Sequence, residues 1–222
     1  MTEAQWALVW TSLGPLVSGA IAGTIPLALM SFVLGLAIAL GVALARLSRV
    51  RAVSGAARVY ISIIRGTPLL VQLFVIFYGL PSIGVVIDPW PSAIIAFALN
   101  VGGYAAEVIR AAILSVPVGQ WEAGHTIGMS RAQTLRRIIL PQATRVSVPP
   151  LSNTFISLVK DTSLASVILV TELFREAQQI ASFSSEFMII YLEAAAIYWV
   201  ICLVLSSGQN VIEKRLDRYV AH

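Results

Sequence analysis

Residues 4–45 read AQWALVWTSLGPLVSGAIAGTIPLALMSFVLGLAIALGVALA and contain no charged side chain. A helix needs about 20 predominantly apolar residues to cross a bilayer, so this run is about twice as long as one span. The pair Gly14-Pro15 divides the run, because proline disfavours the helix around it. The sequence therefore predicts a short interfacial segment at Gln5–Leu13 and a first membrane span at Leu16–Ala45.

The rest of the chain is also strongly apolar. Of its 222 residues, 58% are hydrophobic and only 12% are charged, whereas a soluble domain of this size needs a more charged surface. Further runs long enough to cross a membrane lie at about 59–80, 91–114, 147–170 and 187–211. We therefore expect an all-α polytopic membrane protein with five transmembrane helices, forming a single domain over residues 1–222.

Basic residues concentrate on one side of these spans. Lys and Arg cluster in residues 46–51, 131–145 and 214–218, whereas Arg175 is the basic residue of the opposite loops. Because basic loops stay on the cytoplasmic side, the N-terminus should lie outside and the C-terminus inside, with a cytoplasmic central loop over residues 117–146. The net charge of +4 is then a topology signal, and no nucleic-acid partner is expected.

The central loop contains the pattern Gln120-Trp121-Glu122-Ala123-Gly124-His125-Thr126-Ile127-Gly128, followed by Ile138-Ile139-Leu140-Pro141. We expect Glu122 in the first turn of a short helix, where a carboxylate suits the positive end of the helix dipole. Ala123 and Gly124 would present a slim face that another protein can approach closely. Gly128 is a natural stop for this helix.

A second helix is predicted directly after this stop. Ser130 and Gln133 form a capping box, so the helix should begin at Arg131. Pro141 should end it at Ile139, because proline cannot continue the hydrogen-bond pattern. Without a partner protein, the two helices would simply lie on the membrane surface as a helix-turn-helix.

The loop resembles the cytoplasmic EAA loop of bacterial ABC-importer permeases, in which a short coupling helix docks into an ATPase subunit. The resemblance assigns the ATPase contact to Glu122, Ala123, Gly124, Gly128, Leu140 and Pro141. The one departure is Gly124, where the family pattern usually has alanine. The resemblance implies the type I ABC-importer permease fold, in which ATPase closure is transmitted to the membrane helices.

Three further stretches, residues 60–74, 104–113 and 153–164, resemble the polar amino acid subfamily of these permeases, which serves substrates such as histidine, glutamine and cystine. Residues 168–179 are most similar to permeases of L-cystine importers. The resemblance implies a multi-pass subunit in the bacterial cytoplasmic (inner) membrane that moves a polar amino acid inward, L-cystine first among them. Glutamine, glutamate, histidine and arginine remain alternatives, since selectivity would reside largely in a separate binding protein.

The same resemblance implies partners. Two cytoplasmic ATPase subunits would hold ATP and Mg²⁺, a second permease subunit (identical or a sister chain) would face this one, and an extracytoplasmic solute-binding protein would deliver substrate. The chain has no G-x-x-x-x-G-K-[ST] phosphate loop, and His125 and His222 lack metal-ligand spacing. We therefore expect no enzymatic activity, cofactor or metal in this chain.

An ion-coupled secondary amino acid carrier is the main rival function. Such carriers commonly contain internal repeats of spans, and five spans around one central loop give no matching halves. A membrane-anchored scaffold or sensor is a second rival, but it would not need polar residues within the bilayer.

Charged side chains within the predicted spans are costly and therefore mark structural or functional contacts. The helical rise places Glu107, Arg65 and Arg110 at a similar depth near the inner side, so Glu107 should form a structural ion pair with one of these arginines. Lys160 and Glu193 share a level beyond the midplane and form a second plausible pair.

Asn153, Ser157 and Asp161 recur every four residues and form a polar stripe on the fourth span. A polar stripe faces protein or water, because lipid cannot satisfy it. We expect these residues, with Lys160 and Glu193, to line the translocation path, where Asp161 would meet a substrate ammonium group. The alternative is an interhelical hydrogen-bond seam.

Gly66-Thr67-Pro68 interrupts the second predicted span near its inner side. Proline removes a backbone hydrogen bond, so this point should bend. The bend could act as a hinge, or it could be a fixed kink that Thr67 satisfies.

Overall fold

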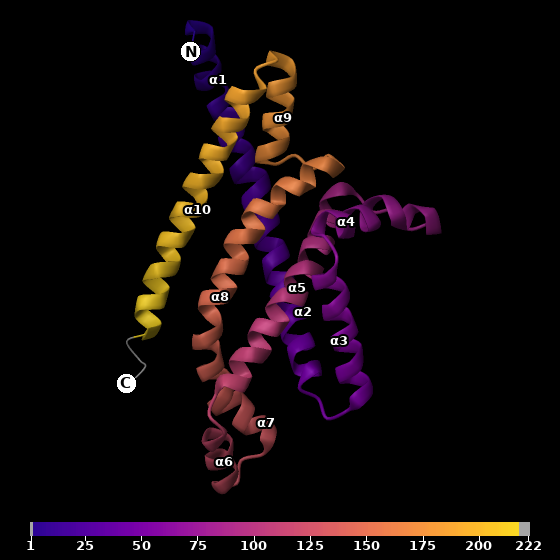
Figure 1. The fold of residues 1–222 in the computed structure, drawn as a ribbon, viewed down its shortest axis with the longest axis vertical. Helices are drawn as coiled ribbons and strands as arrows, with labels where there is room; N and C mark the ends of the chain where they lie inside the picture. The colour runs from indigo at the N-terminus through magenta and orange to yellow at the C-terminus, as the bar shows by residue number, and fades with distance from the viewer. Residues whose placement is uncertain (1, 218–222) are drawn as a thin grey trace.

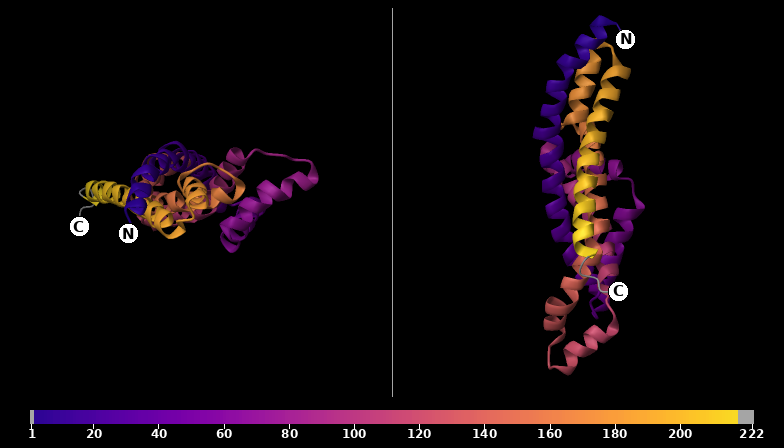
Figure 2. Two further views of the ribbon diagram at one scale, coloured as in Figure 1. Left: turned by 90° about the horizontal axis from the view of Figure 1, so that it is seen from above. Right: turned by 90° about the vertical axis from the view of Figure 1, so that its left-hand side faces the viewer.

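The computed structural model describes residues 2–217, which form helices and no β-strand. The molecule is elongated along its main helices (Figure 1). The N-terminus and α9 (Leu173–Ser184) lie at one end. The opposite end carries α6 (Val118–Thr126), α7 (Arg131–Thr134) and the connection at residues 47–50 (Figure 1; Figure 2).

The first helix is continuous from Glu3 to Arg46. It comprises α1 (Glu3–Gly19), the π-helical turn η1 (Ala20–Thr24) and α2 (Ile25–Arg46). The predicted division at Gly14-Pro15 is therefore wrong, and Gln5–Leu13 is not a separate segment. Proline removes one hydrogen bond from a helix, and the burial of Leu16 against later helices keeps this one continuous.

Three π-helical turns in the described chain share one feature, which is a proline two residues after the turn. In each turn, the residue before proline donates its amide to the carbonyl five residues earlier. These donor–acceptor pairs are Ile25–Ala20 before Pro26, Leu80–Val75 before Pro81 and Leu140–Leu135 before Pro141. A π turn widens the helix and displaces the carbonyl that the proline ring would strike, so the chain continues past each proline.

Pro141 illustrates the consequence. It was expected to end a helix at Ile139, and this prediction is wrong, because the helix runs from Arg131 to Ile168. Within it, α7 is followed by η4 (Leu135–Ile139), α8 (Leu140–Asp161) and the 3-10 helix η5 (Thr162–Ile168). The central loop is thus joined by one helix to the middle of the molecule.

The second predicted span is sharply bent. α3 (Arg51–Gly66) meets the helical run Leu69–Ile83 at 106°, so residues 59–80 do not form one straight helix. The run begins with α4 (Leu69–Phe74) and projects sideways from the body (Figure 1). The predicted interruption at Gly66-Thr67-Pro68 is confirmed, and the bend is braced: Thr67 Oγ1 donates to Ile63 O at 2.8 Å.

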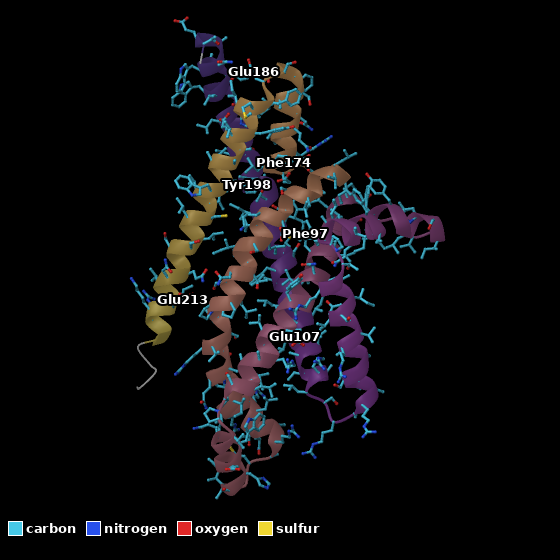
Figure 3. All side chains as sticks on the ribbon, viewed as in Figure 1. Phe97, Glu107, Phe174, Glu186, Tyr198 and Glu213 are labelled. Atoms are coloured by element: carbon cyan, nitrogen blue, oxygen red, sulfur yellow. The ribbon has the colours of Figure 1, made fainter. Side chains whose placement is uncertain are left out.

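The helix α5 (Pro89–Ser115) lies at the centre, packed against α2 and α8 (Figure 1). Its close packing against α2 depends on Gly35, since a Cβ there would lie 2.6 Å from the Val101 side chain. Small residues at four-residue spacing let helices pack this closely. Apolar side chains of α5, among them fully buried Phe97, form the main core with α2 and α8 (Figure 3).

Several helices are long and apolar enough to cross a membrane. Three do so unaided: Glu3–Arg46, Pro89–Ser115 and Phe187–Arg215 within α10 (Phe187–Asp217). The bent pairs Arg51–Gly66 with Leu69–Ile83 and Arg131–Ile168 with Leu173–Ser184 raise the number to five if each pair is one span. Arg218, one of the basic residues of the predicted cytoplasmic tail, and His222 lie outside the described residues.

A buried carboxylate joins three helices at the end of the molecule that carries α9. Glu172 is fully buried and accepts hydrogen bonds from the Phe174 and Arg175 amides at 2.9 and 2.8 Å. The same carboxylate accepts from Tyr198 of α10 at 2.8 Å and from Thr24 of η1 at 3.3 Å. The amino-acid sequence alone gave no sign of this role for Glu172.

Candidate functional site

The end formed by α6 and α7 contains the predicted ATPase contact, and we call residues 118–134 the coupling segment. α6 ends at Thr126, and the predicted stop at Gly128 is confirmed: Gly128 follows the C-cap Ile127 with φ +79 and donates to His125 O at 3.0 Å. The capping box at Ser130 and Gln133 is also confirmed. Both features follow from local backbone hydrogen bonding, which the sequence specifies directly.

Glu122 lies in the middle of α6, so its predicted place in the first turn is wrong. α6 begins at Val118, one turn before Glu122. Pro117 precedes it with φ −53 and has no backbone N–H to donate, so it suits the position just before a helix. The side chains of Glu122 and Ala123 are exposed, and both are accessible to a partner protein.

Gly124 does not form part of the exposed face, which corrects the prediction that it keeps an external contact slim. It is buried against Thr134 of α7, and a Cβ on Gly124 would lie 2.6 Å from Thr134 Cγ2. The absence of a side chain therefore lets α6 pack on α7. Gly124 stands where the resembling family usually has alanine, and the Cβ of an alanine here would overlap the Thr134 side chain.

Gly124→Ala is expected to loosen the coupling segment. The overlap with Thr134 should cost about 1–3 kcal/mol, which outweighs the ~1 kcal/mol that alanine contributes to a helix. Hydrogen exchange of residues 118–134 in the purified chain measures the effect, and Thr134→Ala should restore protection. Gly119→Ala is the matched control, because a Cβ there would meet no other described part of the chain within 4 Å. Equal exchange in Gly124→Ala and the parent chain would contradict this packing.

Leu140 and Pro141 lie where the π turn η4 passes into α8. Leu140 is half-buried against a core cluster that includes Ile113 and Ile139, whereas Pro141 is exposed. These two residues position the start of α8 relative to α5, and they lie beyond the coupling segment itself.

A cavity of about 430 Å³ opens between the bend after α3, the middle of α5 and the end of α8; we call it the polar cavity. The structure brings together Asn153, Ser157 and Asp161 on its wall. The opposite walls are lined by residues including Thr67, Asn100 and Tyr104. Sequence reasoning missed these three, although a polar Asn100 within an apolar span was a usable signal.

Asp161 is half-buried, and no hydrogen bond or ion pair to its side chain occurs within the described chain. Asn153 differs, because its Oδ1 accepts from Gln209 of α10 at 3.1 Å. Asn100 donates to Gln72 at 3.1 Å, and Gln72 donates in turn to Thr67 O at 3.1 Å. The polar cavity thus combines a carboxylate that has no hydrogen-bond partner among the described residues with a wall that side-chain hydrogen bonds connect to the bend after α3.

Lys160 and Glu193 do not line the polar cavity. The predicted Lys160–Glu193 pair is wrong: Lys160 is exposed, and Glu193 Oε2 accepts from Ser12 at 2.6 Å. The rise per residue of a helix predicts only the depth of a side chain and not the direction in which it points. In the structure, Glu193 of α10 faces α1. Ser12, on the segment assigned to the membrane interface, was overlooked as its partner.

Glu107 lies near the end of α5 that carries the coupling segment (Figure 3). Its carboxylate binds Arg110 at 2.7 Å and Arg46, at the end of α2, at 3.4 Å. Arg65 instead lies over the Tyr104 ring, 5.4 Å from its centroid. The ion pairs tie α5 to the end of α2, and Arg46 is the member that sequence reasoning missed.

Comparisons with known proteins extend over almost the whole chain. The profile of the family described as "Binding-protein-dependent transport system inner membrane component" matches residues 37–218. The L-cystine transport system permease protein TcyB of Bacillus subtilis (strain 168) is 62% identical over 221 residues, covering 99% of this chain and 94% of TcyB. The glutamine transport system permease protein GlnP of Escherichia coli (strain K12) is 38% identical over 214 residues, 96% of this chain and 97% of GlnP.

A solved structure shares the arrangement of helices. A chain from the crystal structure of an amino acid ABC transporter with histidines superposes with a TM-score of 0.89 at 36% sequence identity. The superposition covers 97% of this chain and 100% of that chain. The arrangement of helices described above is therefore shared with the whole of that chain.

Proposed function

Because this chain belongs to the family of binding-protein-dependent transport system inner membrane components, we propose that it is the permease subunit of an ATP-driven importer for polar amino acids, with L-cystine as substrate. The similarity to the L-cystine permease TcyB supports this substrate. The similarity to the glutamine permease GlnP supports glutamine as a second candidate, at lower identity.

The main structural support for this mechanism is that a single helix joins the coupling segment to the polar cavity. It runs from Arg131 to Ile168, and Asn153, Ser157 and Asp161 of the cavity wall all lie on it. A displacement of the coupling segment would therefore move the cavity wall. Through such a link, ATP binding and hydrolysis in a partner can bias the chain between two conformations.

The proposed topology has five spans, an external N-terminus and a cytoplasmic C-terminus, in the bacterial inner membrane. It is supported by the arrangement of the ends, since the basic residues 46–51 lie at the same end as α6 and α7, opposite α9 (Figure 1). Basic segments favour the cytoplasmic side. ATPase subunits would then meet the exposed Glu122 and Ala123 from within the cell.

The polar cavity suits a substrate that carries an ammonium group. Among the described residues that line it, Asp161 alone is charged, and the remaining polar groups are hydroxyls and amides. A carboxylate favours a nearby cation, and hydroxyl or amide groups can donate to a substrate carboxylate. A second permease subunit would complete the path, an external binding protein would supply substrate, and ATP and Mg²⁺ would remain on the ATPase subunits.

Glu122→Ala and Gly128→Val in the assembled importer should uncouple ATP hydrolysis from uptake. The first change removes an exposed carboxylate of the coupling segment. The second places a β-branched residue at φ +79, a conformation that costs about 1–3 kcal/mol and should deform the end of α6. Co-elution of the ATPase with the chain, ATP hydrolysis and uptake of labelled L-cystine are measured on the same preparations.

Glu3→Ala is the control, because Glu3 is an exposed acid at the opposite end of the molecule. It should leave both activities unchanged. Failure of the unsubstituted chain to co-elute with an ATPase, together with uptake driven by an ion gradient, would instead identify an ion-coupled carrier.

A further inference from the structure

A second cavity, of about 880 Å³, lies where the coupling segment meets the ends of α2 and α5; we call it the basal cavity. Much of its wall is apolar and comes from the ends of these two helices, including Leu44, Leu47 and Ile113. Trp121 of α6 and Leu135 of η4 extend the apolar wall. The basal cavity is separate from the polar cavity and shares no lining residue with it.

The charged residues lining the basal cavity are all basic. Arg49, from the connection between α2 and α3, and Arg131, from the start of α7, both line it, with His125 beside them. Within the described chain, no Asp or Glu lines the cavity, and neither arginine takes part in an ion pair. The Arg131 guanidinium lies 5.9 Å from the centroid of the Trp121 ring, a cation–π distance that holds it over the apolar wall.

We propose that the basal cavity binds an anionic phospholipid of the adjacent membrane leaflet. Its phosphate would lie between Arg49 and Arg131, and the acyl-chain carbons nearest the headgroup would lie against Leu44 and Ile113. Two arginines without acidic partners suit a phosphate. Basic pockets beside the cytoplasmic ends of membrane helices are suited to anionic headgroups. A soluble phosphate would leave the apolar wall uncovered. A lipid would bind the arginines through its phosphate and cover the apolar wall with its acyl chains.

Such a lipid would have a mechanical consequence. Arg49 belongs to the α2–α3 connection, and Arg131 begins the helix that reaches the polar cavity. A phosphate held by both would tie the coupling segment to α2 at the membrane surface. The inference rests on the proposed function only in assigning the basal cavity to the cytoplasmic side of the membrane. Lipid binding itself requires no ATPase.

The test is native mass spectrometry of the full purified chain, titrated with phosphatidylglycerol or with phosphatidylcholine of the same acyl chains. The unsubstituted chain should retain one phosphatidylglycerol in preference to phosphatidylcholine. Arg49→Gln and Arg131→Gln should each weaken that binding about fivefold, and the double variant about 25-fold, since each basic group contributes on the order of 1 kcal/mol near a charged leaflet. Arg58→Gln, an exposed arginine of α3 outside the cavity, should not change it.

Arg49→Lys and Arg131→Lys preserve the charge and should retain most of the binding, which separates loss of charge from loss of fold. Equal retention of both lipids, or unchanged binding in the double variant, would overturn the proposal. So would competition by inorganic phosphate at concentrations equal to those of the lipid, because that identifies a soluble anion. If the glutamine variants lose ATPase co-elution while lipid binding persists, the basal cavity is a protein interface and the lipid proposal fails.

The lipid site and the proposed function can be rejected independently. Absence of lipid selectivity in a chain that still supports ATP-driven uptake would reject the lipid site alone. Selective lipid binding by a chain that never couples to an ATPase would reject the transport function alone.

Discussion

Gly23→Ala is expected to disrupt the end of the molecule that carries α9 and to give one of the largest losses of stability in this chain. A Cβ at this position would lie 2.6 Å from both Glu172 Cα and Thr171 O, which are backbone atoms. The backbone there cannot withdraw freely, because Glu172 is fixed by four hydrogen-bond donors on α9, α10 and η1. Overpacking together with loss of buried polar bonds should cost about 3 kcal/mol or more.

Thermal unfolding of the detergent-purified chain, followed by size-exclusion chromatography, measures this loss. Gly41→Ala is the matched control within the same continuous helix, since a Cβ there would meet no other described part of the chain within 4 Å. Alanine favours a helix by ~1 kcal/mol over glycine, so the Gly41→Ala chain should be as stable as the parent or slightly more stable. A Gly23→Ala chain of parental stability would contradict the packing of Glu172 on η1.

Asp161→Asn should reduce the uptake efficiency of the assembled importer by about 10- to 100-fold, equivalent to about 1.4–2.8 kcal/mol of lost substrate stabilisation. The substitution keeps the size of the side chain and removes the charge that the polar cavity offers an ammonium group. ATPase co-elution should persist, because Asp161 lies far along α8 from the coupling segment. Uptake of labelled L-cystine over a range of concentrations separates substrate affinity from maximal rate.

Asp88→Asn provides the control for Asp161→Asn, because Asp88 is an exposed carboxylate ahead of α5 and does not line the polar cavity. Asp161→Glu retains the charge and should recover part of the uptake. Unchanged uptake and substrate dependence in Asp161→Asn would show that the polar stripe serves only to pack helices.

Local features of the coupling segment were predictable from the sequence. The stop at Gly128 and the capping box at Ser130 depend on backbone groups a few residues away, which the residue types determine. The strongly apolar runs likewise predicted the main membrane helices. The polar stripe of α8 could be predicted because a four-residue spacing places residues on one helical face.

Other features depended on packing between distant segments. The sequence did not reveal that Gly124 faces Thr134 rather than a partner, because both faces of α6 contain small residues. Glu193 was assigned to Lys160 by depth, but its helix turns it toward Ser12. Proline rules predicted breaks at Pro15 and Pro141; tertiary packing and a π turn respectively keep those helices continuous.

In the proposed function, this chain moves its substrate only when an ATPase drives the coupling segment. The most direct measurement reconstitutes the chain, its ATPase and its binding protein in proteoliposomes and follows accumulation of labelled L-cystine. The proposed function predicts concentrative uptake that requires ATP and the ATPase and that is abolished in Gly128→Val. Uptake that proceeds without the ATPase when an ion gradient is imposed would contradict it.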